Sequence, residues 1–220
     1  MQSFIFIGIT LLSFFLFYYG TGKHKRVMVV SMVWLLVVGM VSYSGYFTNT
    51  TARPPRFLLL IPAIIGLSVL LFKTVDKTKP RTNFLLAIHA LRLPVEWILF
   101  QLFLQKKVPV IMTFKGWNFD IIMGISAILL LLYTLLTRKS ISRRFFLVWN
   151  IAGLIFLTTI VAIAILSSPL PLQQFAFDQP NIAVLEFPFT YLPAFIVPLV
   201  YIVHVVAIKN GLRKGSHQPL

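Results

Sequence analysis

The stretch that decides the fold is residues 119–136, FDIIMGISAILLLLYTLL, which is followed at once by a basic cluster that begins with Arg138 and Lys139. Its only charged side chain, Asp120, lies in its first turn. An α-helix rises about 1.5 Å per residue, so roughly 20 apolar residues cross the hydrocarbon core of a bilayer. The stretch therefore predicts a transmembrane helix with positive charge just beyond its C-terminal end.

Six further stretches have the same apolar character, and they lie at residues 3–19, 27–47, 57–74, 83–104, 145–167 and 189–208. Of the 220 residues, 58% are hydrophobic and only 11% are charged, whereas a soluble domain carries about a quarter charged residues. A soluble fold of this size cannot bury so much apolar surface. We predict an all-α, polytopic transmembrane bundle of seven spans in one domain (1–208), followed by a basic tail (209–220).

The basic residues are distributed unevenly between the loops. Fourteen follow the first, third, fifth and seventh spans: Lys23, Lys25, Arg26, Lys73, Lys77, Lys79, Arg81, Arg138, Lys139, Arg143, Arg144, Lys209, Arg213 and Lys214. The opposite side has five: Arg53, Arg56, Lys106, Lys107 and Lys115. Because cytoplasmic loops carry the excess of Lys and Arg, we expect the N-terminus outside and the C-terminus in the cytoplasm.

The net charge of +15 has a membrane explanation. In a soluble protein it would indicate nucleic-acid binding. Here the basic residues stand in short clusters beside apolar spans, so we expect them to contact anionic lipid headgroups and expect no nucleic-acid partner. The absence of cysteine excludes disulfides, thiol nucleophiles and Cys-ligated metals. No hydrolase, zincin or Walker A motif indicates an enzyme class.

The fourth span holds the strongest functional signal, because His89, Arg92 and Glu96 are spaced to share one helical face. Charges near the middle of a span are costly, so they usually face the bundle interior, find partners and mark a functional site. Two interpretations remain open. The three residues form a polar ligand site or pathway, or Arg92 and Glu96, at i and i+4, form an ion pair that locks the helix against its neighbours.

Two histidines are predicted at similar depth. His204 lies near the cytoplasmic end of the seventh span, and His89 lies near the cytoplasmic start of the fourth. Such a pair would offer ligands to a haem iron or another metal; the alternative is hydrogen bonding within the bundle. Asn150, at comparable depth in the sixth span, would complete a polar cluster or bridge two helices.

The seventh span also carries Tyr201, a candidate ligand-binding residue, and two prolines, Pro193 and Pro198. Proline removes a backbone hydrogen bond, so this pair predicts a kinked or broken helix. Broken helices line the binding sites of many transporters, although most prolines in spans only kink the helix.

Two outer segments, 105–118 and 168–188, are longer than simple turns and mix proline, aromatic and amide residues. They lie at the membrane surface or fold back as a lid over a cavity. Asn118 and Asp120 stand at the start of the fifth span, where either caps the helix N-terminus or belongs to a ligand site. Asp178, in the second segment, is a further candidate ligand residue.

Four stretches, LRLPVE (91–96), MTFKGWNFDI (112–121), WN (149–150) and QQFAFDQPNIAV (173–184), resemble a family of uncharacterised bacterial multi-span membrane proteins. The resemblance covers residues 85–208. It implies a location in the bacterial inner membrane, and it carries no activity over to this chain.

Three functional hypotheses follow from these observations. We favour a small-molecule or ion binding or transport protein with its site between spans four to seven, where Arg92 would hold an anionic or polar group. The alternatives are a membrane enzyme or redox protein that uses His89 and His204, and an accessory subunit without its own ligand. The first three spans, which have almost no ionisable residues within them, are expected to provide scaffold.

Overall fold

The structure is a computed structural model that describes residues 1–76 and 80–213. Within these residues all regular structure is helical, and seven stretches are long and apolar enough to cross a membrane. The predicted all-helical class is confirmed, and so is the prediction of seven helical stretches long and apolar enough to span a membrane. The main helices are α1 (Gln2–Gly20), α2 (Lys25–Tyr43), α3 (Leu60–Val75), α4 (Thr82–Ala90), α5 (Arg92–Leu104), α6 (Asp120–Thr137), α7 (Arg143–Leu166) and α8 (Val197–Arg213).

Short helical turns extend or connect these helices, namely η1 (Tyr46–Thr48), η2 (Arg56–Leu59), η3 (Val110–Met112), η4 (Ala183–Leu185) and η5 (Leu192–Ile196). The second helix ends at Tyr43, four residues before the predicted end, because Gly45 takes a left-handed φ of 73° there. The last helix continues to Arg213, so the predicted tail 209–220 begins inside α8, and its residues from 214 onward lie outside the described part.

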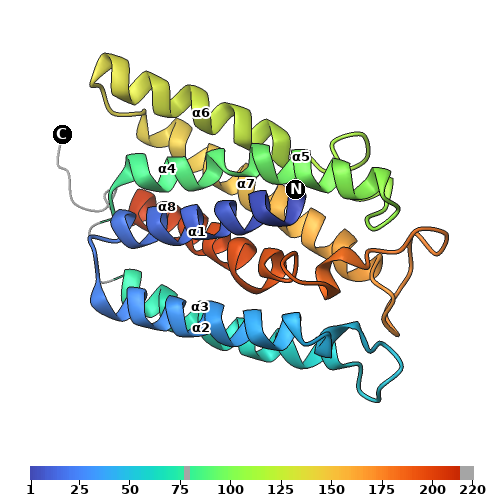
Figure 1. The fold of residues 1–220 in the computed structure, drawn as a ribbon. Helices are drawn as coiled ribbons and strands as arrows, with labels where there is room; N and C mark the ends of the chain where they lie inside the picture. The colour runs from blue at the N-terminus through green and yellow to red at the C-terminus, as the bar shows by residue number, and fades with distance from the viewer. Residues whose placement is uncertain (77–79, 214–220) are drawn as a thin grey trace.

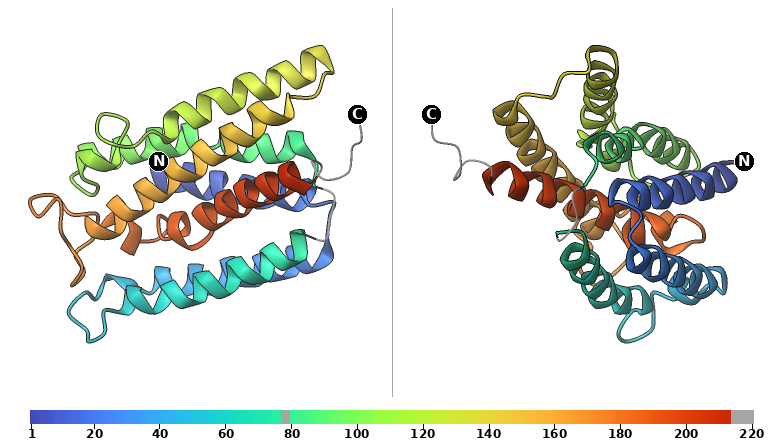
Figure 2. Two further views of the ribbon diagram at one scale, coloured as in Figure 1. Left: turned by 180° about the vertical axis from the view of Figure 1, so that it is seen from behind. Right: turned by 90° about the vertical axis from the view of Figure 1, so that its left-hand side faces the viewer.

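The helices run alternately up and down in one bundle (Figure 1). The connections after α1, α3 and α6 and the end of α8 lie at one end, and the long segments before α3, α6 and α8 lie at the other (Figure 2). The two spans formed by α4–α5 and by η5–α8 are the most buried. In each, 56% of the residues in the most apolar part are buried, against 39% or less elsewhere. These two spans carry most of the predicted site residues.

Pro94 explains why the fourth span consists of two helices. Proline has no N–H to donate to the carbonyl four residues earlier, here that of Ala90. The helix is interrupted at Leu91, between α4 and α5, and Val95 N resumes the pattern by donating to Leu91 O. The break places Arg92 at the start of α5, close to the Ala90 carbonyl that receives no hydrogen bond from Pro94.

The seventh span is irregular as predicted. It begins with the π-helical turn η5, and Pro198 follows in the first turn of α8. Because Pro198 has no N–H for the carbonyl of Ala194, that carbonyl is available to another donor. Trp34 Nε1 of α2 supplies the hydrogen bond at 2.8 Å. An indole from a neighbouring span thus satisfies the backbone group that the proline leaves unpaired.

The outer segment 105–118 folds back into the bundle. Asn118 contacts Glu96, which lies eight residues before the end of α5 and therefore about 12 Å below that end. Helix α6 consequently begins well inside the bundle. Non-helical backbone at such depth must be buried in protein or line a cavity. Trp117 N donates to Ile111 O, and Gly116 N donates to Thr113 O.

The two outer segments are also bonded to each other. The carbonyl of Lys107 accepts hydrogen bonds from Ile182 N and Ala183 N, and its ammonium pairs with Glu186 at 2.5 Å. Gln179 Nε2 donates to two carbonyls around the end of α5, at Phe103 and Val108. The second segment therefore forms a cover at this end of the bundle rather than a free loop.

A glycine-to-alanine pair tests the packing of α2. A Cβ at Gly39 would collide with the hydroxyl of Tyr191, which donates to Leu35 O at 3.0 Å, whereas a Cβ at Gly66 would meet open space. We expect Gly39→Ala to lower the free energy of unfolding by about 1–3 kcal/mol. Gly66→Ala should be neutral or stabilising by up to about 1 kcal/mol. Thermal unfolding in detergent measures both; equal effects would contradict the described contact.

Candidate functional site

Seven of the nine predicted site residues converge in one buried cluster, although they come from four spans and the segment before α6. Each is no more than 7% exposed. They are His89 of α4, Arg92 and Glu96 of α5, Asn118, Asp120 of α6, Asn150 of α7 and His204 of α8.

A directed chain of hydrogen bonds runs through the cluster. Arg92 Nη2 lies 3.1 Å from His204 Nε2, and His204 Nδ1 lies 2.9 Å from Asn150 Oδ1. Asn150 Nδ2 donates to Phe146 O at 2.8 Å. A guanidinium only donates, so Nε2 of His204 accepts and its Nδ1 carries the proton. His204 is therefore a neutral imidazole whose two nitrogens are both engaged.

The ion pair of Arg92 differs from the expected one. Its Nη1 lies 3.4 Å from Asp120 Oδ1, in a contact with both side chains buried. Within the described residues, Arg92 and Glu96 are not within ion-pair distance of each other. The expected i, i+4 pair is wrong, because the returning segment brings Asp120 to Arg92 and brings Asn118 to Glu96.

Asn118 connects the carboxylates to the backbone. Its Nδ2 donates to Glu96 Oε1 at 2.6 Å and to Met112 O at 3.0 Å. Its Oδ1 accepts from Asp120 N, the first residue of α6, at 3.0 Å, although Phe119 and not Asn118 occupies the N-cap position. The positive end of the α6 dipole thus lies beside Asp120, where an acid is favourable.

His89 packs by ring contact alone. Its ring centroid lies 4.2 Å from that of His204 and 5.2 Å from that of Trp149, and neither of its nitrogens has a hydrogen-bond partner among the described residues. Two rings tilted by 34° at this separation leave no space for a porphyrin between them. Both nitrogens of His204 are already bonded, so this arrangement disfavours the alternative of a haem or metal site and favours hydrogen bonding within the bundle for His204.

Glycines let the helices approach closely at the cluster. A Cβ at Gly153 of α7 would lie 2.5 Å from His204 Cε1 and 2.6 Å from Met123 Cε. At Gly124 of α6 a Cβ would lie 3.0 Å from Leu93 N. Sequence reasoning did not identify these positions, because a glycine in a span has no local signature of a close contact.

A cavity of about 450 Å³ extends from the cluster between α3, α5, α7 and α8. Its polar end is formed by Glu96, Asn118, Asp120 and Tyr201, and the remaining wall is mostly aliphatic. Tyr201 donates through its hydroxyl to Thr158 Oγ1 at 3.1 Å. The cavity identifies the part of the cluster that a ligand can reach.

Several wall residues were not predicted. Helix α3 contributes Ile61, Ile64, Ile65 and Ser68, so the third span, which was expected mainly to provide scaffold, also forms part of the cavity wall. The cover segment contributes Asn181, whose amide donates to Ala164 O. Only the tertiary arrangement brings these residues to the site, and their local sequence offers no signal.

Five predicted residues take no part in the cavity wall, namely His89, Arg92, Asn150, Asp178 and His204. Arg92 and His204 lie behind the carboxylates and are not among its lining residues. The ligand-holding role expected of Arg92 therefore has no support in the geometry. Asp178 is exposed in the outer segment and lines neither the cavity nor the buried cluster.

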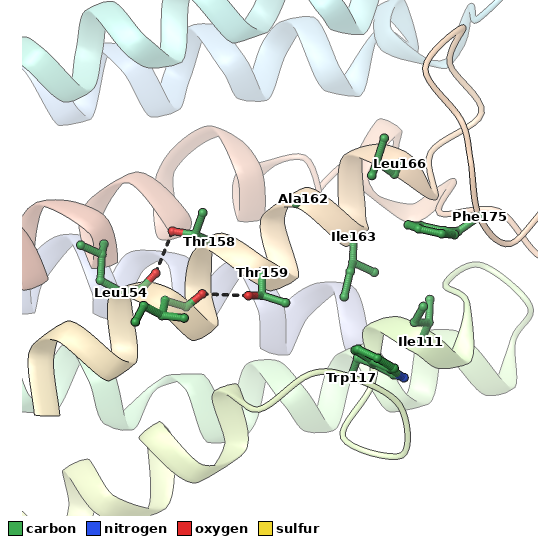
Figure 3. Close-up of a pocket in the computed structure, with 10 residues that line it drawn as sticks. Ile111, Trp117, Leu154, Thr158, Thr159, Ala162, Ile163, Leu166 and Phe175 are labelled. Carbon is green, nitrogen blue, oxygen red and sulfur yellow. Dashed lines mark hydrogen bonds between the residues drawn. The ribbon is translucent and has the colours of Figure 1, made fainter.

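A second hollow of about 760 Å³ runs along the outer half of α7 (Figure 3). Trp117 and Phe175 border it, and the hydroxyls of Thr158 and Thr159 donate to carbonyls of their own helix. Of the described residues that line it, none is ionisable. On a bundle that crosses a membrane this groove faces lipid, so it is a weaker candidate for a specific site.

Comparison with known proteins gives one match. A family model described as "Domain of unknown function (DUF8737)" matches residues 56–210, which run from η2 to α8 and include the whole cluster and cavity. No curated protein and no solved structure matches the chain.

The Arg92–Asp120 contact is testable by a double-mutant cycle. Arg92→Met should lower the free energy of unfolding by about 3–5 kcal/mol, because it leaves a buried carboxylate unpaired. Adding Asp120→Asn should recover part of that loss. Lys107→Met, at the half-exposed pair with Glu186, serves as the control and should cost at most about 1 kcal/mol. Additive losses at Arg92 and Asp120 would contradict the pairing.

Proposed function

Because the chain belongs to the family described as Domain of unknown function (DUF8737), whose description states no activity, we propose its function from the geometry of the buried site. The protein is a membrane binding or transport protein for a small amphipathic molecule. The polar group of the ligand lies at Glu96, Asn118 and Asp120, and its apolar part fills the cavity between α3, α7 and α8.

One observation carries this proposal: a cavity with a mostly aliphatic wall ends on a buried carboxylate that has an unused oxygen. Glu96 is 2% exposed, and no described residue donates a hydrogen bond to its Oε2. Pockets for small molecules are typically apolar with a few convergent polar groups. Ionisable groups inside a membrane protein mark ligand or ion pathways by default.

A purely structural role explains Arg92 better than it explains Glu96. One buried arginine needs one carboxylate, and Asp120 provides it. Glu96 is a second carboxylate in the same buried region, and its desolvation is costly without a full set of partners. A buried carboxylate that costs folding free energy and forms no ion pair is expected where it binds a ligand.

The cavity also has a route to its surroundings. Ile65 of α3 lines it and is 58% exposed, so the cavity opens at this face of α3. In a membrane this face contacts acyl chains, so an amphipathic ligand would enter sideways from the lipid. The outer end is covered by Ser168, Leu170 and Asn181.

We further propose that the protein resides in a bacterial inner membrane, with the N-terminus outside and the C-terminus in the cytoplasm. The end of the bundle that carries the connections after α1, α3 and α6 has most of the basic residues, and these would contact anionic headgroups. Lys209 of α8 pairs with Asp76 at this end, at 2.6 Å.

A matched pair of substitutions in α7 tests the cavity. Ala164 lines the cavity, whereas Ala162 faces the open groove. We expect Ala164→Phe to abolish the thermal stabilisation of the purified protein by 1-hexanol, because the new ring occupies the cavity, and Ala162→Phe to respond as the native chain does. A bound ligand at 100 times its Kd stabilises by about 2.7 kcal/mol. An unchanged response of Ala164→Phe would overturn the proposal.

Orientation is measurable without background labelling, because the chain has no cysteine. Thr51 and Ser140 are exposed in connections at opposite ends of the bundle. In intact cells a membrane-impermeant maleimide should label Thr51→Cys, and it should label Ser140→Cys only after permeabilisation. The reverse pattern would mean that the C-terminus is outside.

A further inference from the structure

We propose that the ligand of this cavity is an organic monocation, an alkylammonium ion with a medium-sized apolar body. This inference rests on the proposed binding function and specifies the substrate class. It follows from three features of the described residues: the sign of the charges in the wall, the balance of hydrogen-bond donors and acceptors, and the apolar character of the remaining surface.

The charge of the wall favours a cation. Among the described lining residues, the charged ones are Glu96 and Asp120, and both are acids. Arg92 neutralises Asp120 from behind, and the bonds of His204 make it a neutral tautomer. When Glu96 is ionised it is the unbalanced charge, and one positive charge on the ligand would balance it. An anion would meet two carboxylates and no cationic lining side chain.

The donors of the wall are already used. The amide of Asn118 donates to Glu96 and Met112, and the hydroxyl of Tyr201 donates to Thr158. The hydroxyl of Ser68 donates to Ile64 O of its own helix, and that of Ser168 donates to Ala164 O in the last turn of α7.

Acceptors remain in the same wall. Glu96 Oε2 and Asn181 Oδ1 are buried and have no donor among the described residues. Leaving a buried acceptor without a donor costs more free energy than one formed hydrogen bond contributes to stability. The complementary ligand therefore supplies N–H groups, which an ammonium ion does and a carboxylate does not.

The rest of the wall selects an apolar body rather than a bare metal ion. Side chains such as Ile61, Leu99, Leu157 and Val197 surround the space away from the polar end. Hard cations require six or more oxygen ligands, which this wall does not converge on one point. A hydrocarbon chain attached to the ammonium would fill that space and exclude water from the ion pair with Glu96.

Three six-carbon probes that differ only in their polar group test the inference: hexylammonium, 1-hexanol and hexanoate. In thermal-shift titrations of the intact protein, hexylammonium should stabilise at concentrations at least about tenfold lower than 1-hexanol, because a hydrogen bond to a charged group is stronger. Hexanoate should not stabilise. Partition into micelles cancels when one probe is compared between variants, and the three probes are compared with one another at their free aqueous concentrations.

Glu96→Gln is the decisive variant, because glutamine keeps an oxygen that accepts from Asn118 and loses the charge. It should weaken the response to hexylammonium by about tenfold or more and leave the response to 1-hexanol unchanged. Glu186→Gln makes the same change in the other glutamate of the chain, at the outer end, and should respond as the native protein does.

The outcomes separate the two proposals. If none of the three probes stabilises the native protein, the proposed binding function fails. If 1-hexanol binds and hexylammonium has no advantage, or if hexanoate binds best, the binding function stands and the cationic ligand is overturned. The selectivity of the native protein needs no substitution, so it decides the question even if Glu96→Gln does not fold.

Discussion

The arginine buried inside the bundle is the constraint on which the arrangement of α5 to α8 depends. A guanidinium does not lose its proton in a protein, so Arg92 must find partners wherever the chain buries it. Asp120 meets it from α6 and His204 from α8, and Asn150 of α7 holds His204 in the accepting tautomer. One side chain therefore fixes the register of four helices. Gly153 permits the close approach that these bonds require.

The contacts of Arg92 divide the cluster into two parts. One part is structural, and the other faces the cavity. Arg92 and the two histidines lie behind and do not line the cavity; a hydrogen bond joins Arg92 to His204, and a ring contact joins His204 to His89. Glu96 lies in front, held through one oxygen by Asn118 and open to the cavity through the other. Pre-organised polar groups at the end of an apolar space are the usual basis of small-molecule specificity. The proposed function depends on this separation.

Local sequence predicts the spans and most of the cluster, because hydropathy is a local property and a charge inside a span must be buried by some partner. It does not predict which partner. Arg92 and Glu96 have the spacing of an ion pair, yet Asp120 displaces Glu96, because segment 105–118 turns back into the bundle. The part of the cavity wall that α3 forms likewise depends on how α3 packs against α8. These features arise from contacts between segments distant in sequence, which no single span encodes.

The most direct test of the account is the position of a bound ammonium ion. A structure of the protein with 6-bromohexylammonium would locate the ligand by the anomalous signal of its bromine. We expect bromine among the aliphatic side chains of α3 and α7 that line the cavity, with the ammonium nitrogen in hydrogen-bond contact with Glu96 Oε2. Bromine found only in the open groove along α7 or on the outer surface, with Glu96 uncontacted, would contradict it.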